Sequence, residues 1–336
     1  MNHTPETLHI EQAKSMQQKL HYEPGAGFFA QKRAIGEKLT ELLRPLPRTA
    51  PAQPIIEYTK DCGSYENTRF CYESEPGFFV PAHLLLPKAQ AGKLPVVICL
   101  QGHSTGMYLS LGEKRMKRDG WLLRTQDMDY AVQAVKQGYA ALILEQRGFG
   151  EQNASTEHDN TNCTDMVMQA LILGRTLLGE RCHDVSALID LLPAFPALDT
   201  DKIGIMGQSG GGTVTIYSAC TDTRIKVAMP SGSLCPYFDS IISLHHCSCN
   251  YLPGMFEQME MADLTALIAP RPLVVVAGER DRIFPIDAVK RGFEQVRAIY
   301  DDAGEPDNCA LVIGNEGHRF YAAQAWPLFR KYMEQL

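Results

Sequence analysis

A serine surrounded by glycines is the first feature of this chain that could perform chemistry. The stretch 204–213 reads GIMGQSGGGT and contains the spacing Gly-x-Ser-x-Gly around Ser209. In a nucleophile elbow of this kind a strand ends abruptly, a helix begins, and the serine is held in a strained backbone conformation. The positions two residues before and after the serine must then lack side chains. The spacing predicts a nucleophile at Ser209, and a glycine-rich turn with an incidental serine is the alternative.

A phosphate-binding loop is a competing interpretation of the same glycines. A P-loop requires Lys-Ser or Lys-Thr after its last glycine, to reach the phosphates and magnesium. Here Gly212 is followed by Thr213 and Val214, and no lysine is nearby. The dinucleotide fingerprint Gly-x-Gly-x-x-Gly is matched only by skipping positions. These mismatches favour the nucleophile.

A serine nucleophile needs a base, and the base needs a third group to orient it. Two later apolar runs, each typical of a buried strand, end in the stretches AGERDRIFP and GNEGHRF. Asp281 and His318 lie in the loops directly after these strands, so the order along the chain is serine, acid, histidine. The sequence therefore predicts Asp281 as the orienting acid and His318 as the base. The competing acids in the same loops are Glu279 and Glu316.

A tetrahedral intermediate also needs backbone donors directed at its oxyanion. The amide of Gly210, the residue after the serine, is one candidate. The second candidate lies in the loop LQGHSTG after the apolar run 94–101, where Gly102 allows a turn and His103 presents its N–H. The alternative for His103 is a side chain at the rim of the cleft.

Strand and helix patterns alternate along most of the chain. Apolar runs suited to buried parallel strands alternate with helical segments from residue 94 onward, which predicts an α/β fold with helices on both faces of a mostly parallel sheet. Residues 55–87 read as short antiparallel strands at its N-terminal edge. We expect an N-terminal helical arm and proline-rich linker over 1–54, and a catalytic domain over 55–336. We expect residues 231–269 to form an insertion over the cleft.

Composition and charge exclude several classes of function. The chain has 336 residues, a formal net charge of −7 and no long basic run, which argues against nucleic acid or an anionic membrane as partner. Its first residues lack the basic and apolar regions of a signal peptide, and no run of 18 apolar residues could span a membrane. We therefore expect a cytoplasmic protein without a membrane partner.

Ten cysteines are too few for a disulfide scaffold, and several lie in apolar runs, which indicates buried free thiols. The stretch HHCSCN, residues 245–250, invites comparison with zinc sites. However, the sequence shows no second well-spaced pair of ligands elsewhere. We expect no metal and no cofactor.

The quoted motifs resemble the α/β-hydrolase superfamily. GQSGGG, AGERDRIFP and GNEGHRF, together with RGFGE at 147–151, are similar to its acetyl-xylan-esterase-like and dienelactone-hydrolase-like branch, and the resemblance covers roughly residues 60–336. It implies the α/β-hydrolase fold, with Ser209, Asp281 and His318 as nucleophile, acid and base. The oxyanion donors would be Gly210 and His103, although Gln101 stands where the family often has histidine. The dienelactone hydrolases proper use cysteine in place of Ser209.

In such a fold, the segment between the sixth and seventh strands overhangs the cleft. Five of its residues could line the acyl or alcohol pocket: Tyr237, His246, Cys249, Asn250 and Met255. The alternative for these side chains is packing in the core. Arg147 is expected to connect loops at the sheet edge.

These features together predict a serine carboxylesterase acting on small-molecule, short-acyl esters through an acyl-enzyme. The alternatives are a peptidase or lactone hydrolase on the same fold, and a non-catalytic ligand receptor. A homo-oligomer is compatible with the sequence.

Overall fold

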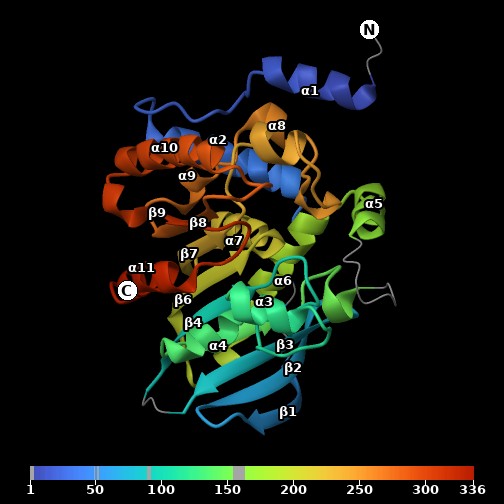
Figure 1. The fold of residues 1–336 in the computed structure, drawn as a ribbon, viewed down its shortest axis with the longest axis vertical. Helices are drawn as coiled ribbons and strands as arrows, with labels where there is room; N and C mark the ends of the chain where they lie inside the picture. Colours follow the sequence, from blue (N-terminus) through green and yellow to red (C-terminus); the bar gives the residue numbers. More distant parts are fainter. Residues whose placement is uncertain (1–3, 49, 51–52, 89–91, 154–162) are drawn as a thin grey trace.

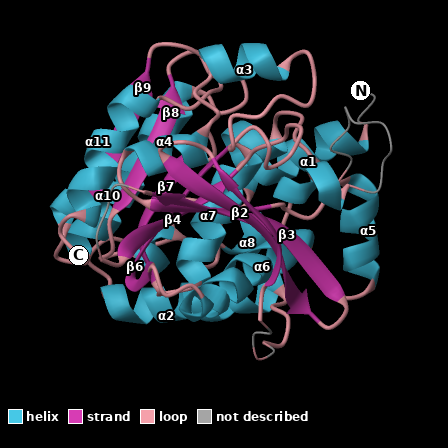
Figure 2. Ribbon diagram, turned by 90° about the horizontal axis from the view of Figure 1, so that it is seen from below, coloured by secondary structure: helices cyan, strands magenta, loops and turns pink. Residues whose placement is uncertain are grey.

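The computed structural model describes residues 4–336 except 49, 51–52, 89–91 and 154–162. Its centre is a twisted sheet with helices packed on both faces (Figures 1 and 2). The strands of this sheet are β1 (Ile55–Asp61), β2 (Tyr65–Glu75), β3 (Phe78–Pro87), β4 (Leu94–Leu100), β5 (Ala140–Leu144), β6 (Leu198–Gln208), β7 (Ile225–Ser231), β8 (Leu273–Gly278) and β9 (Cys309–Gly314).

Within the described residues the strand order is β1-β2-β3-β5-β4-β6-β7-β8-β9. The first three strands pair antiparallel with one another, and β3 pairs antiparallel with β5. All pairs from β5 to β9 are parallel. The predicted α/β-hydrolase fold, with antiparallel strands at the N-terminal edge, is confirmed.

Helices cover both faces of the sheet because its central strands are apolar on both sides. Along β4, Val96, Ile98 and Leu100 face one hydrophobic cluster, while Val97 and Cys99 face the other. The first cluster includes residues of α2 (Phe28–Leu43), α6 (Leu177–Leu191), α7 (Gly210–Thr221) and α10 (Ile286–Asp302). The second includes residues of α4 (Tyr130–Lys136) and α11 (Ala322–Met333). The shorter or peripheral helices are α1 (Pro5–Ser15), α3 (Asp119–Thr125), α5 (Thr164–Ile172), α8 (Met255–Gln258) and α9 (Thr265–Ile268).

The N-terminal segment packs on the rest of the chain. Ile35, Leu39 and Leu43 of α2 are buried in the first cluster. The amides of Lys19 and Leu20, which follow α1, donate to the carbonyls of Glu257 and Gln258 in the insertion. The helical pattern over 164–192 is divided into α5 and α6, because Gly174 adopts the left-handed conformation with φ 73°. Among the described residues, no helix is long and apolar enough to span a membrane.

Candidate active site

The turn between β6 and α7 has the backbone conformation that the Gly-x-Ser-x-Gly spacing predicts. Ser209 has φ 57° and ψ −123°, a conformation that non-glycine residues rarely adopt. A Cβ atom on Gly207 would lie 2.4 Å from the Gly211 carbonyl oxygen, and one on Gly211 would lie 2.2 Å from that of Leu100. Both glycines are therefore needed for the strand and helix to approach so closely.

Asp281 and His318 lie in contact, as predicted. The distance from His318 Nδ1 to Asp281 Oδ2 is 2.7 Å. The other carboxylate oxygen, Oδ1, accepts the amides of Ile283 and Phe284 at 3.0 and 3.2 Å. Because the side chain of Asp281 is only 1% exposed, these donors replace its hydration and hold its orientation.

The ring of His318 is held beside the end of β7. Its Cε1 atom lies 3.0 Å from where a Cβ on Gly232 would stand, and the ring stacks on Phe284 with 5.7 Å between centroids. The carbonyl of Ser231, the residue before Gly232, accepts a hydrogen bond from the amide of Ser209 at 2.8 Å. The nucleophile turn therefore lies at the same end of β7 as His318. Nε2 of His318 is buried and has no hydrogen-bond partner among the described residues. It can therefore accept a proton.

The two competing glutamates do not approach this histidine. Glu279 and Glu316 are both exposed, and Glu316 pairs with Arg319 at 2.7 Å. Of the three acids considered in these loops, the structure brings only Asp281 to His318.

The loop after β4 lies directly against the nucleophile turn, because β4 and β6 are neighbours in the sheet. A Cβ on Gly102 would lie 2.9 Å from Cβ of Ser209. The ring of His103 lies over Gly210, with Cε1 2.9 Å from a Cβ placed there. Within the described part of the chain, the amides of Gly210 and His103 donate no hydrogen bond. Both amides are free to act as oxyanion donors, the roles predicted for them.

A buried carboxyl group, which sequence reasoning missed, connects the two ends of this loop. Glu145 follows β5 and accepts the side-chain amide of Gln101 at 2.7 Å and the backbone amide of Met107 at 3.1 Å. Cβ atoms on Gly106 and Gly150 would lie within 2.4 and 2.0 Å of its Oε2. Its position directly after a buried apolar strand was the available signal. Glu145 thus positions the loop that carries His103.

Burial raises the pKa of Glu145 to about 8. Between pH 4.5 and 8, Glu145 therefore keeps its proton in the folded chain but loses it in the unfolded chain. The unfolding free energy contributed by this group falls as the pH rises from about 4.5 to about 8. We expect the unfolding free energy of the wild type, relative to Glu145→Gln, to fall across this window by up to about 1.4 kcal/mol per pH unit.

Urea denaturation at intervals from pH 5 to 8 measures this difference. Glu294→Gln, which removes one exposed carboxylate of α10, reports the effect of a surface charge alone. A difference between wild type and Glu145→Gln that stays constant across the window would contradict the prediction.

Three of the five predicted pocket residues lie near the nucleophile or its base. His246 packs edge-on against Phe284, which itself stacks on His318, and burial lowers the pKa of His246. Asn250 accepts the hydroxyl of Thr213, in the first turn of α7, at 3.0 Å. Cys249 Sγ lies 3.2 Å from His103 Nε2.

The other two predicted pocket residues, Tyr237 and Met255, pack in the core, which is the alternative that the sequence left open. The Tyr237 hydroxyl shares a buried hydrogen bond with that of Tyr217 in α7. Met255, at the start of α8, is 2% exposed within the first hydrophobic cluster. Position within an insertion does not determine which way a side chain points.

Arg147 has the structural role expected of it. It binds Asp184 of α6 through two hydrogen bonds of 2.8 and 2.7 Å, and pairs with Glu75 of β2 at 2.7 Å. This buried network joins the antiparallel edge of the sheet to α6.

The sequence argued against a metal because it showed no further ligands for Cys247 and Cys249. In the folded chain such ligands lie beside them. Cys247 and Cys249 meet two further candidate ligands, which are distant in the sequence: His103 and Cys163. Hydrogen bonds from Cys163 and Cys249 hold the pKa of the Cys247 thiol well below its ordinary value. Neither His245, which is exposed, nor His246 belongs to this group.

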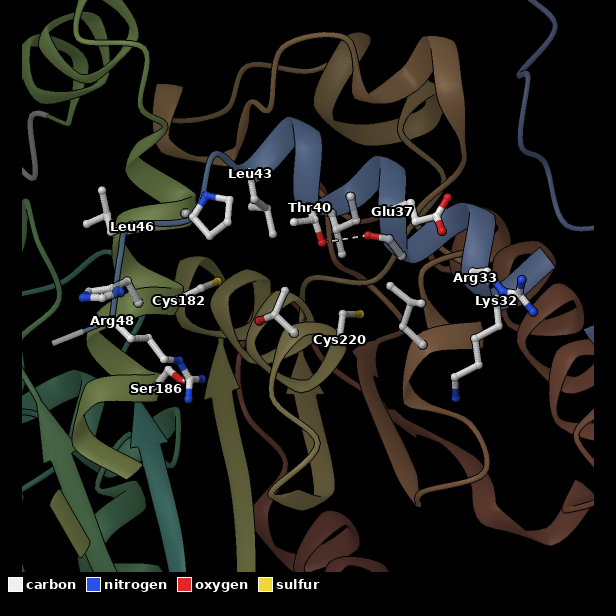
Figure 3. Close-up of a pocket in the computed structure, with 17 residues that line it drawn as sticks. Lys32, Arg33, Glu37, Thr40, Leu43, Leu46, Arg48, Cys182, Ser186 and Cys220 are labelled. Carbon is white, nitrogen blue, oxygen red and sulfur yellow. Dashed lines mark hydrogen bonds between the residues drawn. The ribbon is translucent and has the colours of Figure 1, made fainter. Parts of the chain in front are cut away.

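A separate cavity of about 770 Å³ lies between α2, α6 and α7 (Figure 3). Thr40, Cys182, Ser186 and Cys220 are among the residues that line it. Cys220 is near the last residue of α7, whereas Ser209 precedes the first, and the helical rise separates them by about 16 Å. This cavity is therefore distinct from the candidate active site.

The chain matches the Abhydrolase family over residues 11–325. It belongs to that family. The match includes α2 as well as the sheet, and it covers the nucleophile turn and the loops that carry Asp281 and His318. This hydrolase is similar in sequence to YtaP of Bacillus subtilis (strain 168), a protein whose name assigns it provisionally to the hydrolases. The two are 26% identical over 244 residues, which is 71% of this chain and 77% of YtaP.

Solved structures of the same fold include several esterases. A Bacteroides fragilis NCTC 9343 protein, provisionally named an acetyl xylan esterase, has a TM-score of 0.78 and 16% identity, covering 98% of this chain and 90% of that one. A glucuronoyl esterase from Teredinibacter turnerae T7901 has a TM-score of 0.70 and 15% identity, covering 96% and 90%. At these identities the likeness establishes the fold.

Proposed function

We propose that this hydrolase is a serine carboxylesterase that cleaves short-acyl esters of a small-molecule alcohol. One observation carries the proposal: Nε2 of His318 is buried and has no hydrogen-bond partner in the described part of the chain. The ring is held by Asp281 at 2.7 Å, beside the strained Ser209 turn. A base so placed serves to accept the proton of a nucleophile.

In the proposed mechanism His318 Nε2 takes the hydroxyl proton of Ser209 as its oxygen attacks the ester carbonyl. The amides of Gly210 and His103 stabilise the oxyanion, and Asp281 stabilises the imidazolium. The proton then passes from His318 to the leaving alkoxide, which departs as the alcohol and leaves an acyl-serine. Water, deprotonated by the same histidine, releases the acid and restores Ser209. No step requires a cofactor.

The structural relatives support an ester as the substrate, since proteins named as acetyl xylan and glucuronoyl esterases are among them. A peptidase or lactone hydrolase on this fold would use the same groups. A ligand receptor would have no need of a base beside the serine.

Labelling with a serine-directed fluorophosphonate tests the proposal. We expect a covalent adduct, located by peptide mass spectrometry on Ser209. Hydrolysis of nitrophenyl esters, but not of the matching nitroanilides, separates an esterase from a peptidase. A protein that binds esters without labelling or turnover would be a receptor.

The acyl group is expected to be short. The insertion places polar side chains, His246 and Asn250, near the catalytic groups. The ring of Phe284, from the loop between β8 and α10, lies against His246 and His318. A long acyl chain gains about 0.8 kcal/mol per methylene only where a dry groove receives it, and overpacking costs more. We expect kcat/KM for nitrophenyl acetate to exceed that for nitrophenyl octanoate by roughly tenfold or more. A preference for octanoate would contradict the short-acyl assignment alone.

A further inference from the structure

Four side chains with the chemistry of zinc ligands meet beside the candidate active site. They come from three segments: His103 from the loop after β4, Cys163 directly before α5, and Cys247 and Cys249 from the insertion. Their ligand atoms all lie within 4.8 Å of one another. Cys163 and Cys249 are buried, and the other two are partly buried.

The spacing of these atoms fits a tetrahedral site. Zinc bonds of about 2.3 Å to sulfur and 2.0 Å to nitrogen place neighbouring ligand atoms roughly 3.5–3.8 Å apart. The distance between Sγ of Cys249 and Sγ of Cys247 is 3.5 Å, and that between Cys249 Sγ and His103 Nε2 is 3.2 Å. Small adjustments of side-chain torsions would complete the geometry.

A buried arginine supplies a second, independent observation. Arg181 of α6 is 1% exposed, yet among the described residues it pairs with no carboxylate. Its guanidinium donates twice to the Arg147 carbonyl, at 3.0 and 2.6 Å, and once to Cys163 Sγ at 3.4 Å. A buried cation requires a compensating negative charge. Zinc with three thiolates and one neutral imidazole carries a net charge of −1, which would balance the guanidinium.

We propose that His103, Cys163, Cys247 and Cys249 bind one zinc ion in a closed Cys₃His site. Four protein ligands leave no position for water or substrate, so the ion is structural rather than a Lewis acid for the reaction. Three thiolates also exclude the hard cations magnesium and calcium, which prefer oxygen ligands.

The site joins the oxyanion loop to the insertion. His103 would bind zinc through its side chain, while its backbone amide is the second oxyanion donor of the proposed function. Zinc would thus hold that donor in place relative to Gly210, whose lack of a side chain leaves room for the His103 ring. The binding of zinc itself does not depend on the proposed catalytic function.

Metal analysis of the wild-type protein, purified untagged under reducing conditions from zinc-supplemented cells, is the primary test. We expect about one zinc per chain by plasma mass spectrometry. An organomercurial that modifies thiols should release it to a colorimetric chelator. Cys163→Ser and Cys247→Ser should each reduce bound zinc to less than about a tenth of the wild-type content. Cys235→Ser, at a buried cysteine of a separate cluster, should retain it.

Cobalt substitution tests the ligands by a signature independent of activity. The cobalt protein should show thiolate charge-transfer bands and the intense visible bands of a tetrahedral site, and these should be lost in Cys247→Ser. Wild-type protein that binds neither metal, or that forms a disulfide among these three thiols with zinc present, would overturn the proposal. This wild-type result is decisive even if the variants do not fold. Fluorophosphonate labelling of Ser209 reports on the esterase proposal separately.

Discussion

Replacing Ser209 with alanine is expected to reduce kcat for ester hydrolysis by at least about 10⁴-fold. The change removes the oxygen that attacks the carbonyl, and no other hydroxyl replaces it in the turn. The fold should persist, because the conformation of the turn depends on the close approaches at Gly207 and Gly211 rather than on the hydroxyl. Water attack assisted by the oxyanion donors would account for the remaining rate.

Steady-state hydrolysis of nitrophenyl acetate measures this loss, with thermal denaturation to confirm folding. Ser243→Ala, at an exposed serine of the insertion, is the matched control and should retain wild-type activity. A folded Ser209→Ala protein that keeps more than a few per cent of activity would show that another residue is the nucleophile.

Asp281→Asn is expected to reduce kcat by about 10⁴-fold, the loss typical when the orienting acid of a triad is replaced by its amide. Asp281 Oδ1 accepts two backbone amides, from Ile283 and Phe284, so in the variant the amide oxygen should occupy that position. The NH₂ group would then face Nδ1 of His318. Nδ1 must become the acceptor, which puts the proton on Nε2 and removes the base from Ser209.

The other acids of these loops provide the control for this substitution. Glu279→Gln and Glu316→Gln change exposed carboxylates and should leave kcat within about twofold of wild type. The measurement is kcat across a pH series, with thermal unfolding in parallel. Normal activity in Asp281→Asn, or a large loss in either glutamine variant, would assign the orienting acid to a different residue.

The local part of the site could be predicted from the sequence, because it depends on short-range spacing. The nucleophile turn needs glycine at 207 and 211, and both close approaches occur in the structure. The order of apolar strands and the loops after them placed Asp281 and His318 at the same edge of a parallel sheet, where they meet at 2.7 Å.

The partners of these groups could not be predicted, because they depend on strand order and on side-chain direction. Pairing of β4 with both β5 and β6 brings Glu145 to the oxyanion loop and Gly102 to Ser209. Nothing local in the sequence indicates that pairing. Likewise, the position of Tyr237 in the insertion did not show that its hydroxyl turns inward to Tyr217.

The four thiol and imidazole ligands illustrate the same division. From the sequence, Cys247 and Cys249 were a pair without partners. Cys163 is separated from them by two strands and three α-helices, and His103 by still more of the chain. Only the packing of α5 and the insertion against the end of β4 brings their ligand atoms within 4.8 Å. Sequence spacing therefore predicted the candidate nucleophile, acid and base, whereas long-range packing decided what surrounds them.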